Sequence, residues 1–176
     1  MGEHGQHGAL VRRWIACLAT ALLAGSAAQA QCRLALLIGL DVSASVDAVE
    51  YAGGHVALAI YEWSGRRQQT VMLDWTLIDS AARLDAVIAT VFGARRGWKD
   101  WPTAIGYALG YGAGMLRDAP SCDRRVIDIS GDGTNNEGFL PESAYRHFPF
   151  QDVTVNGLVI EGQDDEVVEF YRANVL

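Results

Sequence analysis

The amino-acid sequence predicts an α/β fold with a mostly parallel central sheet, on three observations. Short apolar segments alternate along the chain with segments of helical character, an order typical of α/β domains. Residues 34–40 form a continuous apolar run, the pattern of a strand buried on both faces in a parallel sheet. The turn at residues 64–67 joins two further runs closely, which predicts one antiparallel hairpin at the edge of the sheet.

The individual elements follow from the same patterns. Strands are expected at residues 34–40, 56–61, 70–78, 125–129 and 153–160. Asp79 and Ser80 are suitable caps for a helix over residues 81–92, and Thr103 for a helix over residues 104–117. A short helix is expected after Pro141 and a last one at residues 164–174.

Length and composition limit the possible classes of protein. A chain of 176 residues, 50% hydrophobic and 20% charged, has room for one domain with a packed core and is not expected to be disordered. The net charge of −7 argues against nucleic acid or an anionic lipid surface as the main partner, since both require a basic patch.

The N-terminal 30 residues have the features of a secretory signal peptide. Arg12 and Arg13 precede an apolar run over residues 14–23, and small residues lead to Ala30. A membrane anchor is the alternative, but the run is shorter than the ~20 apolar residues of a membrane span. We expect cleavage after Ala30, which leaves an exported domain over residues 31–176.

Two cysteines, Cys32 and Cys122, remain after that cleavage. Cys32 lies nine residues before Asp41, and Cys122 lies ten before Asp132. If the two strands are parallel neighbours with the aspartates level at one end, the cysteines are nearly level at the other. Neighbouring strands lie ~4.8 Å apart, which suits the Cα separation of a disulfide. A Cys32–Cys122 disulfide is therefore predicted; two unrelated buried thiols are the alternative.

Three polar clusters follow predicted elements and together suggest a metal site. Asp41, Ser43 and Ser45 end the first strand, Thr103 precedes a helix, and Asp132 follows the fourth strand. Ligands of open α/β sheets bind beyond the carboxyl ends of the strands, where these clusters would converge. Two carboxylates and three hydroxyls are hard oxygen donors that suit Mg²⁺, Mn²⁺ or Ca²⁺.

Simpler interpretations exist for each cluster. Asp41, Ser43 and Ser45 are also typical of a strand-end turn with a helix cap. A separate calcium loop over residues 132–137 is a further interpretation, but Glu137 stands where such a loop requires glycine. No serine lies in a Gly-x-Ser-x-Gly elbow, which weakens a hydrolase interpretation.

Other polar and aromatic residues are assigned structural roles. His55 and His147 have no matching ligands nearby in the pattern, and Arg66 with Arg67 is a charged hairpin tip. Trp98 and Trp101 flank Thr103 and either pack the loop or anchor a partner beside the site. Asp128 and Asn156 interrupt strands expected to be buried, so internal hydrogen bonds are predicted for both.

Taken in order, these residues resemble the metal-ion-dependent adhesion site of von Willebrand factor type A (vWA) domains. The similarity extends to an uncharacterised bacterial family of secreted vWA proteins through residues 61–65, 75–79, 102–106, 125–133 and 155–158. It spans roughly residues 32–176 and implies a three-layer, Rossmann-like vWA fold. The location implied is periplasmic or secreted.

The resemblance also implies roles for the site residues. The hydroxyls of Ser43, Ser45 and Thr103 would bind the ion directly, and Asp41 and Asp132 directly or through water. One coordination position would stay open for water or for a carboxylate from a protein partner. The implied function is cation-dependent protein binding without a catalysed reaction.

Two segments depart from the family pattern. The first crossover is short, since residues 46–52 allow at most two helical turns. The family also continues beyond residue 176 with a further strand and helix. We therefore expect a truncated version in which one sheet face lacks cover and exposes apolar surface.

Two alternative functions follow from these observations. One is a Mg²⁺-dependent hydrolase using the same carboxylates, with Glu62 or Asp47 as the additional acidic group near the ion. The other is a truncated fragment without a function of its own.

Overall fold

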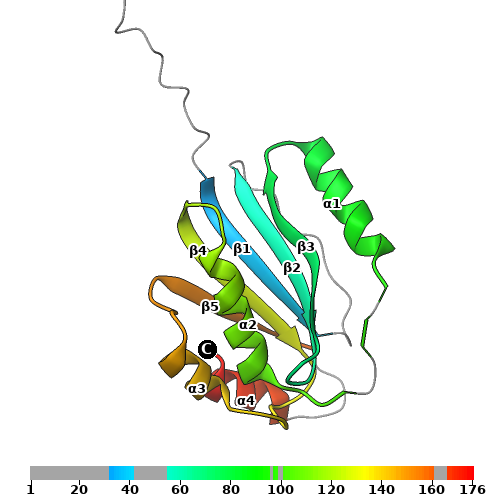
Figure 1. Cartoon of the computed structure of the whole chain (residues 1–176). Helices are drawn as coiled ribbons and strands as arrows, with labels where there is room; N and C mark the ends of the chain where they lie inside the picture. Colours follow the sequence, from blue (N-terminus) through cyan, green and yellow to red (C-terminus); the bar gives the residue numbers. More distant parts are fainter. Residues whose placement is uncertain (1–31, 42–54, 96, 99–100, 161–165) are drawn as a thin grey trace, which may run out of the picture. The chain divides into compact units, whose positions relative to one another are not determined.

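The computed structural model describes residues 32–41, 55–95, 97–98, 101–160 and 166–176. These residues form a five-stranded sheet with the order β3-β2-β1-β4-β5 (Figure 1). The strands are β1 (Cys32–Asp41), β2 (Val56–Trp63), β3 (Gln69–Ile78), β4 (Cys122–Gly131) and β5 (Val153–Val159). The helices are α1 (Ala81–Gly93), α2 (Ile105–Arg117), α3 (Pro141–His147) and α4 (Glu166–Asn174).

The pairing of the strands confirms a mostly parallel sheet with one antiparallel hairpin. β1 pairs in parallel with β2 on one side and with β4 on the other, and β4 pairs in parallel with β5. β2 and β3 are antiparallel and place the hairpin at the sheet edge. The central position of β1 explains its continuous apolar run, because a strand with neighbours on both sides and layers on both faces meets little water.

Helices lie on both faces of the sheet. α2, α3 and α4 lie on one face, and α1 packs on β3 at the other (Figure 1). The larger core lies under α2 and includes Leu37, Tyr61, Ile105, Leu109 and Ile127. A smaller core on the other face includes Leu36, Leu58, Ile78, Val87 and Val126. The alternation of Leu36 and Leu37 between the two cores shows that β1 is buried on both faces.

One predicted helix cap is confirmed and another is wrong. Ser80 caps α1, and its Oγ accepts a hydrogen bond from the backbone N–H of Arg83 at 3.3 Å. Thr103 does not cap α2, because the helix begins later and its N-cap position is Ala104, which supplies no side-chain bond. The side chain of Asn135 caps the buried first turn of α2 instead: its Oδ1 accepts from the N–H of Gly106 at 3.1 Å.

On the face of the sheet that carries α1, the edge strand β5 is exposed to solvent. Thr154, Asn156 and Leu158 are exposed, and Leu158 retains 62% of its surface. The expected apolar exposure is thus found at Leu158, whereas Val126, on the same face of neighbouring β4, is buried. The predicted hydrogen bond is also present, since Asn156 Nδ2 donates to Asp128 Oδ1 at 2.7 Å. Asn156 is nevertheless exposed rather than buried.

The predicted disulfide joins β1 to β4. Cys32 and Cys122 are partners in the parallel register, and their Cα atoms lie 4.5 Å apart. The bond closes a loop with a sequence separation of 90 residues. None of the described helices is long and apolar enough to cross a membrane.

Several predictions fall outside the described residues. They are the signal peptide over residues 1–30, the short crossover with its helical turns at residues 46–52, and the positions of Ser43, Ser45 and Asp47. These stay predictions.

Loss of the disulfide is expected to lower the free energy of unfolding by about 2–5 kcal/mol, because a loop of this length strongly restricts the unfolded chain. The measurement is urea unfolding of the protein with and without dithiothreitol, and of a Cys32→Ser/Cys122→Ser variant. Dithiothreitol is expected to shift the midpoint of the wild-type protein and leave that of the double variant unchanged. Equal midpoints for all samples would contradict the prediction.

Tyr61 lies in the larger core and supplies a pH-dependent part of the stability. Its side chain is wholly buried, and its hydroxyl donates to the carbonyl oxygen of Ala108 at 2.9 Å. Burial, followed by the neighbouring Tyr111 and Tyr171, raises the pKa of Tyr61 well above its usual value. Burial also raises the pKa of Tyr145, to about 12. The folded state therefore keeps phenol protons that the unfolded chain releases above about pH 10.

Stability is accordingly expected to be independent of these groups below about pH 10 and to fall as the pH rises further. The Tyr61→Phe variant should show a slope shallower by about 1.4 kcal/mol per pH unit above that point. Urea unfolding from about pH 8 to about pH 11.5, a range that includes the free tyrosine pKa of about 10, measures this. An unchanged slope in the variant would contradict the assignment.

Candidate metal centre

The carboxyl ends of β1, β2 and β4 lie side by side, at the end of the sheet where the sequence predicts the candidate site (Figure 1). This carboxyl end of the strands is the edge of the sheet meant below. In the parallel ladders Leu40 is level with Glu62 on one side and with Ser130 on the other. Asp41 is the last residue of β1, and Asp132 follows directly after the last residue of β4. The two aspartates therefore leave neighbouring strands at the same edge.

Thr103 is fixed to the loop that contains Asp132. The backbone N–H of Thr103 donates to Asn136 Oδ1 at 2.8 Å. Its carbonyl oxygen accepts from the N–H groups of Asn136 at 3.0 Å and Glu137 at 3.1 Å. The position that a Cβ on Gly133 would take is 3.1 Å from Thr103 Oγ1. The hydroxyl thus lies against the residue that follows Asp132.

The hairpin turn between β2 and β3 holds the same segment from the other side. Ser64 is only 7% exposed, and its Oγ donates to the carbonyl oxygens of Trp101 at 3.3 Å and Pro102 at 3.2 Å. Its own carbonyl oxygen accepts from the N–H of Ala104 at 3.0 Å. The residues on both sides of Thr103 are therefore bonded to one buried serine.

The structure brings together part of the predicted ligand set. Thr103 and the exposed Asp132 lie in adjoining segments at the edge, and Asp41 is placed there by its backbone. Ser43 and Ser45 are outside the described residues. Within the described part, the Thr103 hydroxyl has no hydrogen-bond partner, so its oxygen is available as a ligand. A carboxylate and a neutral hydroxyl are donors that fit Mg²⁺ or Ca²⁺.

Among the described residues there is no group of three or more His, Cys, Asp or Glu that could hold a metal ion. The predicted set does not require one, because three of its five ligands are hydroxyls and two of these lie at positions 43 and 45. The oxygen donors of the described ligands, Thr103 and Asp132, therefore fit the predicted ion.

The alternative hydrolase function requires a further acidic group near the ion, and of its two candidates Glu62 lies within the described residues. Its side chain is 2% exposed, and both carboxylate oxygens accept from the N–H of Gly97, at 2.9 and 3.1 Å. The carboxylate thus anchors the chain after α1 to the sheet edge. Asp47, the other candidate, lies outside the described residues.

The simpler assignments of the charged and aromatic residues are largely met. Glu137 pairs with Arg66, whose Nε lies 3.2 Å from Glu137 Oε1. The Trp98 indole donates to Thr70 Oγ1 at 3.1 Å and packs edge-on against Trp101 at 6.4 Å. Trp101 is still 51% exposed, so it both packs the loop and faces solvent.

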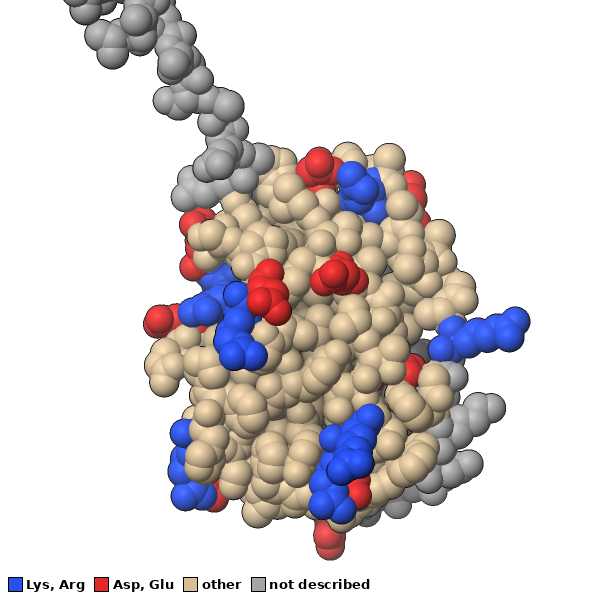
Figure 2. Space-filling model, in the orientation of Figure 1, with Lys and Arg blue, Asp and Glu red and all other residues tan. Residues whose placement is uncertain are grey.

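Charged side chains form small groups rather than one patch on the face shown in Figure 2. His147, on α3, lies with its Nδ1 2.8 Å from the carbonyl oxygen of Ser143, in agreement with a structural role. These distributions offer no extended basic surface on that face, in keeping with the net charge of −7.

Sequence analysis missed the residues that align the site. They are Ser64, Asn135 and Asn136, which bond to the segment 101–106 from two different loops. The adjacent asparagines after Asp132-Gly133-Thr134 were the available signal, since asparagine side chains commonly bond to backbone groups of loops.

The strand order and the antiparallel hairpin give an α/β fold that is similar to that of solved von Willebrand factor type A proteins. The chain belongs to the family described as "Protein of unknown function (DUF1194)", whose model matches residues 51–176. Among proteins of curated function, none matches the sequence.

Solved structures with the same fold come from animals and bacteria. Proximal thread matrix protein 1 of the mussel byssus is 15% identical with a TM-score of 0.56, covering 83% of this chain and 42% of that chain. Its form with a zinc-occupied MIDAS motif is 14% identical with a TM-score of 0.56, covering 83% and 42%. A von Willebrand factor type A protein from Catenulispora acidiphila is 17% identical with a TM-score of 0.52, covering 82% and 36%. This chain thus spans less than half the length of each of these proteins.

Replacing Asn135 by alanine is expected to lower the free energy of unfolding by about 1–2 kcal/mol, because the first turn of α2 loses its cap. The Asn135 Nδ2 bond to the carbonyl of Glu137 is lost as well. Urea unfolding measures the change. Asn156→Ala is the matched control: it removes one exposed hydrogen bond and should cost no more than about 0.5 kcal/mol. Equal losses in both variants would contradict the capping role.

Proposed function

We propose that this chain is an exported protein-binding module of the adhesion type that depends on a divalent cation. Asp41, Ser43, Ser45, Thr103 and Asp132 hold the ion, which is Mg²⁺, with Mn²⁺ or Ca²⁺ as alternatives. The partner is a protein that offers a carboxylate to the open coordination position. No chemical reaction is part of this proposal.

One observation carries the proposal: Thr103 is locked to the loop after β4 at the edge where β1 also ends. The two backbone hydrogen bonds accepted by Thr103 and the one that it donates leave its side chain at Gly133. Segments far apart in sequence are thereby held together independently of any ion. Such preorganisation reduces the entropy that binding an ion would otherwise cost.

In this proposal the strand ends position the two aspartates, and the loop after β4 positions Thr103. The strand ends set the spacing of Asp41 and Asp132, because β1 and β4 are directly paired. Thr103 contributes a neutral hydroxyl oxygen. Its position depends on the hydrogen bond from the Thr103 N–H to Asn136 and not on capping α2. When bound, the ion supplies positive charge and a vacant position for a carboxylate.

The fold comparisons support a metal at such an edge. One vWA-fold structure, from the mussel byssus, is described as having a zinc-occupied MIDAS motif. The ligand set proposed here contains only oxygen donors, which favours Mg²⁺, Mn²⁺ or Ca²⁺ over zinc.

Location outside the cytoplasm belongs to the same proposal. A disulfide between β1 and β4 is typical of proteins in oxidising compartments. Together with the features of residues 1–30 it supports a periplasmic or secreted protein.

Isothermal titration of Mg²⁺, Mn²⁺ and Ca²⁺ into the purified protein tests the site. Asp132→Ala and Thr103→Val are expected to weaken binding by about tenfold or more, since each removes one ligand of the ion. Asp128→Asn is the matched control, because it removes a carboxylate from β4 but keeps an oxygen for the bond from Asn156. Identical heats for all variants, or a loss in Asp128→Asn equal to that in Asp132→Ala, would contradict the proposal.

A further inference from the structure

A pocket of about 330 Å³ opens next to the Thr103 segment. Its walls come from the β2–β3 turn, from the chain before α2, from α2 itself and from the loop before α3. The lining residues are Arg66, Arg67, Gln68, Trp101, Tyr107 and Glu137. The pocket borders the candidate metal centre, because Glu137 donates its N–H to the carbonyl of Thr103 at 3.1 Å.

Hydrogen bonds and ring stacking hold the lining residues of this pocket in place. Glu137 holds Arg66 at two points, through the Arg66 backbone N–H at 3.0 Å and through Nε at 3.2 Å. Tyr107 stacks on Phe139 with ring centroids 4.2 Å apart. Gly138, with a φ of 73°, lets the loop pass Tyr107, where a Cβ would lie 2.5 Å from the ring.

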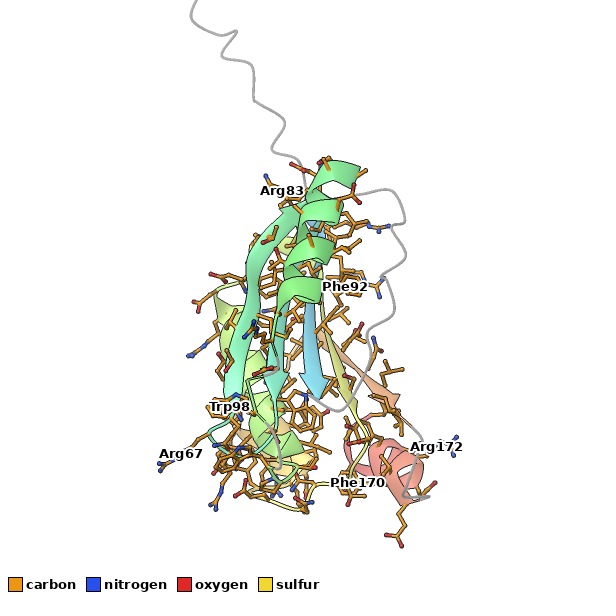
Figure 3. All side chains as sticks on the ribbon, turned by 90° about the vertical axis from the view of Figure 1, so that its right-hand side faces the viewer. Arg67, Arg83, Phe92, Trp98, Phe170 and Arg172 are labelled. Atoms are coloured by element: carbon orange, nitrogen blue, oxygen red, sulfur yellow. A yellow bond between two sulfur atoms is a disulfide. The ribbon has the colours of Figure 1, made fainter. Side chains whose placement is uncertain are left out.

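Among the described lining residues, Arg67 is the charged side chain without an ion-pair partner. Arg66 and Glu137 neutralise each other as an ion pair. Arg67 is exposed, and within the described residues its guanidinium has no ion-pair partner. The backbone N–H of Arg67 donates to Gln68 Oε1 at 3.2 Å, which leaves the guanidinium out of this bond. Arg67 and Trp98 both lie at the end of the molecule towards which β1 points, as Figure 3 shows.

The other walls are two aromatic side chains, Trp101 and Tyr107, and the amide side chain of Gln68. Trp101 presents 51% of its surface, and the ring of Tyr107 is partly exposed. A free guanidinium beside exposed aromatic rings fits a carboxylate followed or preceded by an apolar side chain. Phosphate-rich ligands fit less well, because among the described lining residues only Arg67 lacks an ion-pair partner, in a chain with a net charge of −7.

We propose that this pocket binds an acidic segment of the protein partner, with Arg67 pairing with a carboxylate and Trp101 packing against a neighbouring apolar side chain. The inference rests on the proposed function in one respect, since a second carboxylate of the same segment would complete the shell of the ion at Thr103. Arg67 contributes to binding whether or not the ion is present. The pocket therefore sets which acidic segments are bound, and the ion sets how tightly.

Fluorescence anisotropy with two labelled peptides tests this in the purified protein. One is a nonapeptide with the repeat Glu-Phe-Gly, and the other has the repeat Gln-Phe-Gly; both have blocked ends. In EDTA, the glutamate peptide is expected to bind about tenfold more tightly than the glutamine peptide, because a charged hydrogen-bonded pair is lost in the latter. Added Mg²⁺ is expected to strengthen only the glutamate peptide.

Three variants locate the effect. Arg67→Gln should abolish the preference for glutamate in EDTA, and Trp101→Ala should weaken both peptides. Arg83→Gln is the control, since Arg83 is an exposed arginine at the opposite end of the molecule (Figure 3). Thermal melts of Arg67→Gln and Arg83→Gln should match that of the wild-type protein, because both side chains are exposed.

The outcomes separate the pocket from the metal centre. No binding of the glutamate peptide in EDTA, equal binding of both peptides there, or equal effects of Arg67→Gln and Arg83→Gln would overturn the pocket proposal. A glutamate preference that is lost in Arg67→Gln but does not respond to Mg²⁺, with no heat of metal binding, would support the pocket and overturn the metal-dependent function.

Discussion

The arrangement of the site depends on one constraint: backbone groups in three neighbouring loops must find hydrogen-bond partners away from regular structure. Buried N–H and C=O groups are nearly always paired, because leaving one unpaired is costly. Here the β2–β3 turn, the segment before α2 and the loop after β4 satisfy each other, through Ser64, Asn135 and Asn136. Loss of Ser64 or Asn136 would therefore remove a hydrogen bond that positions the Thr103 segment.

The parallel register of β1 and β4 transmits order from one end of the sheet to the other. The ladder pairs Cys32 with Cys122 at its start and Leu40 with Ser130 near its end. The disulfide fixes that register, because slipping by one residue would separate the cysteines and turn every side chain of the strand to the other face. Because Leu40 pairs with Ser130, Asp132 lies one residue beyond the position level with Asp41, and both aspartates stand at the same end of the ladder.

The sequence was sufficient where the determining interactions are local or periodic. The continuous run of β1 predicted a strand buried on both faces, Ser80 predicted the start of α1, and counting from the aspartates predicted the disulfide. These features depend on hydrophobic pattern, on neighbouring residues or on strand spacing. The resemblance of the polar residues to a vWA site then predicted the fold class, whereas the strand order was first given by the structure.

The sequence was insufficient where distant residues compete for the same backbone group. Thr103 is a good cap by residue type, yet Asn135, 29 residues from Gly106, takes the first turn of α2. Asn156 was expected in a buried strand, but its exposure depends on what covers β5 and not on the strand's own pattern. Both errors arise because a residue's partners are set by tertiary packing, which local propensity does not describe.

Charge decides how an acidic chain can recognise an acidic partner. At physiological salt, charges separated by more than about 8 Å are largely screened, so the net charge of −7 repels a carboxylate only weakly at a distance. Within that range the local groups dominate, and the Arg66–Glu137 pair cancels itself. Among the residues that the structure describes around the pocket, Arg67 is then the positive charge that a carboxylate meets, together with a bound divalent ion. Recognition by such a surface is expected to depend on close contact and shape, with little long-range attraction to accelerate the encounter.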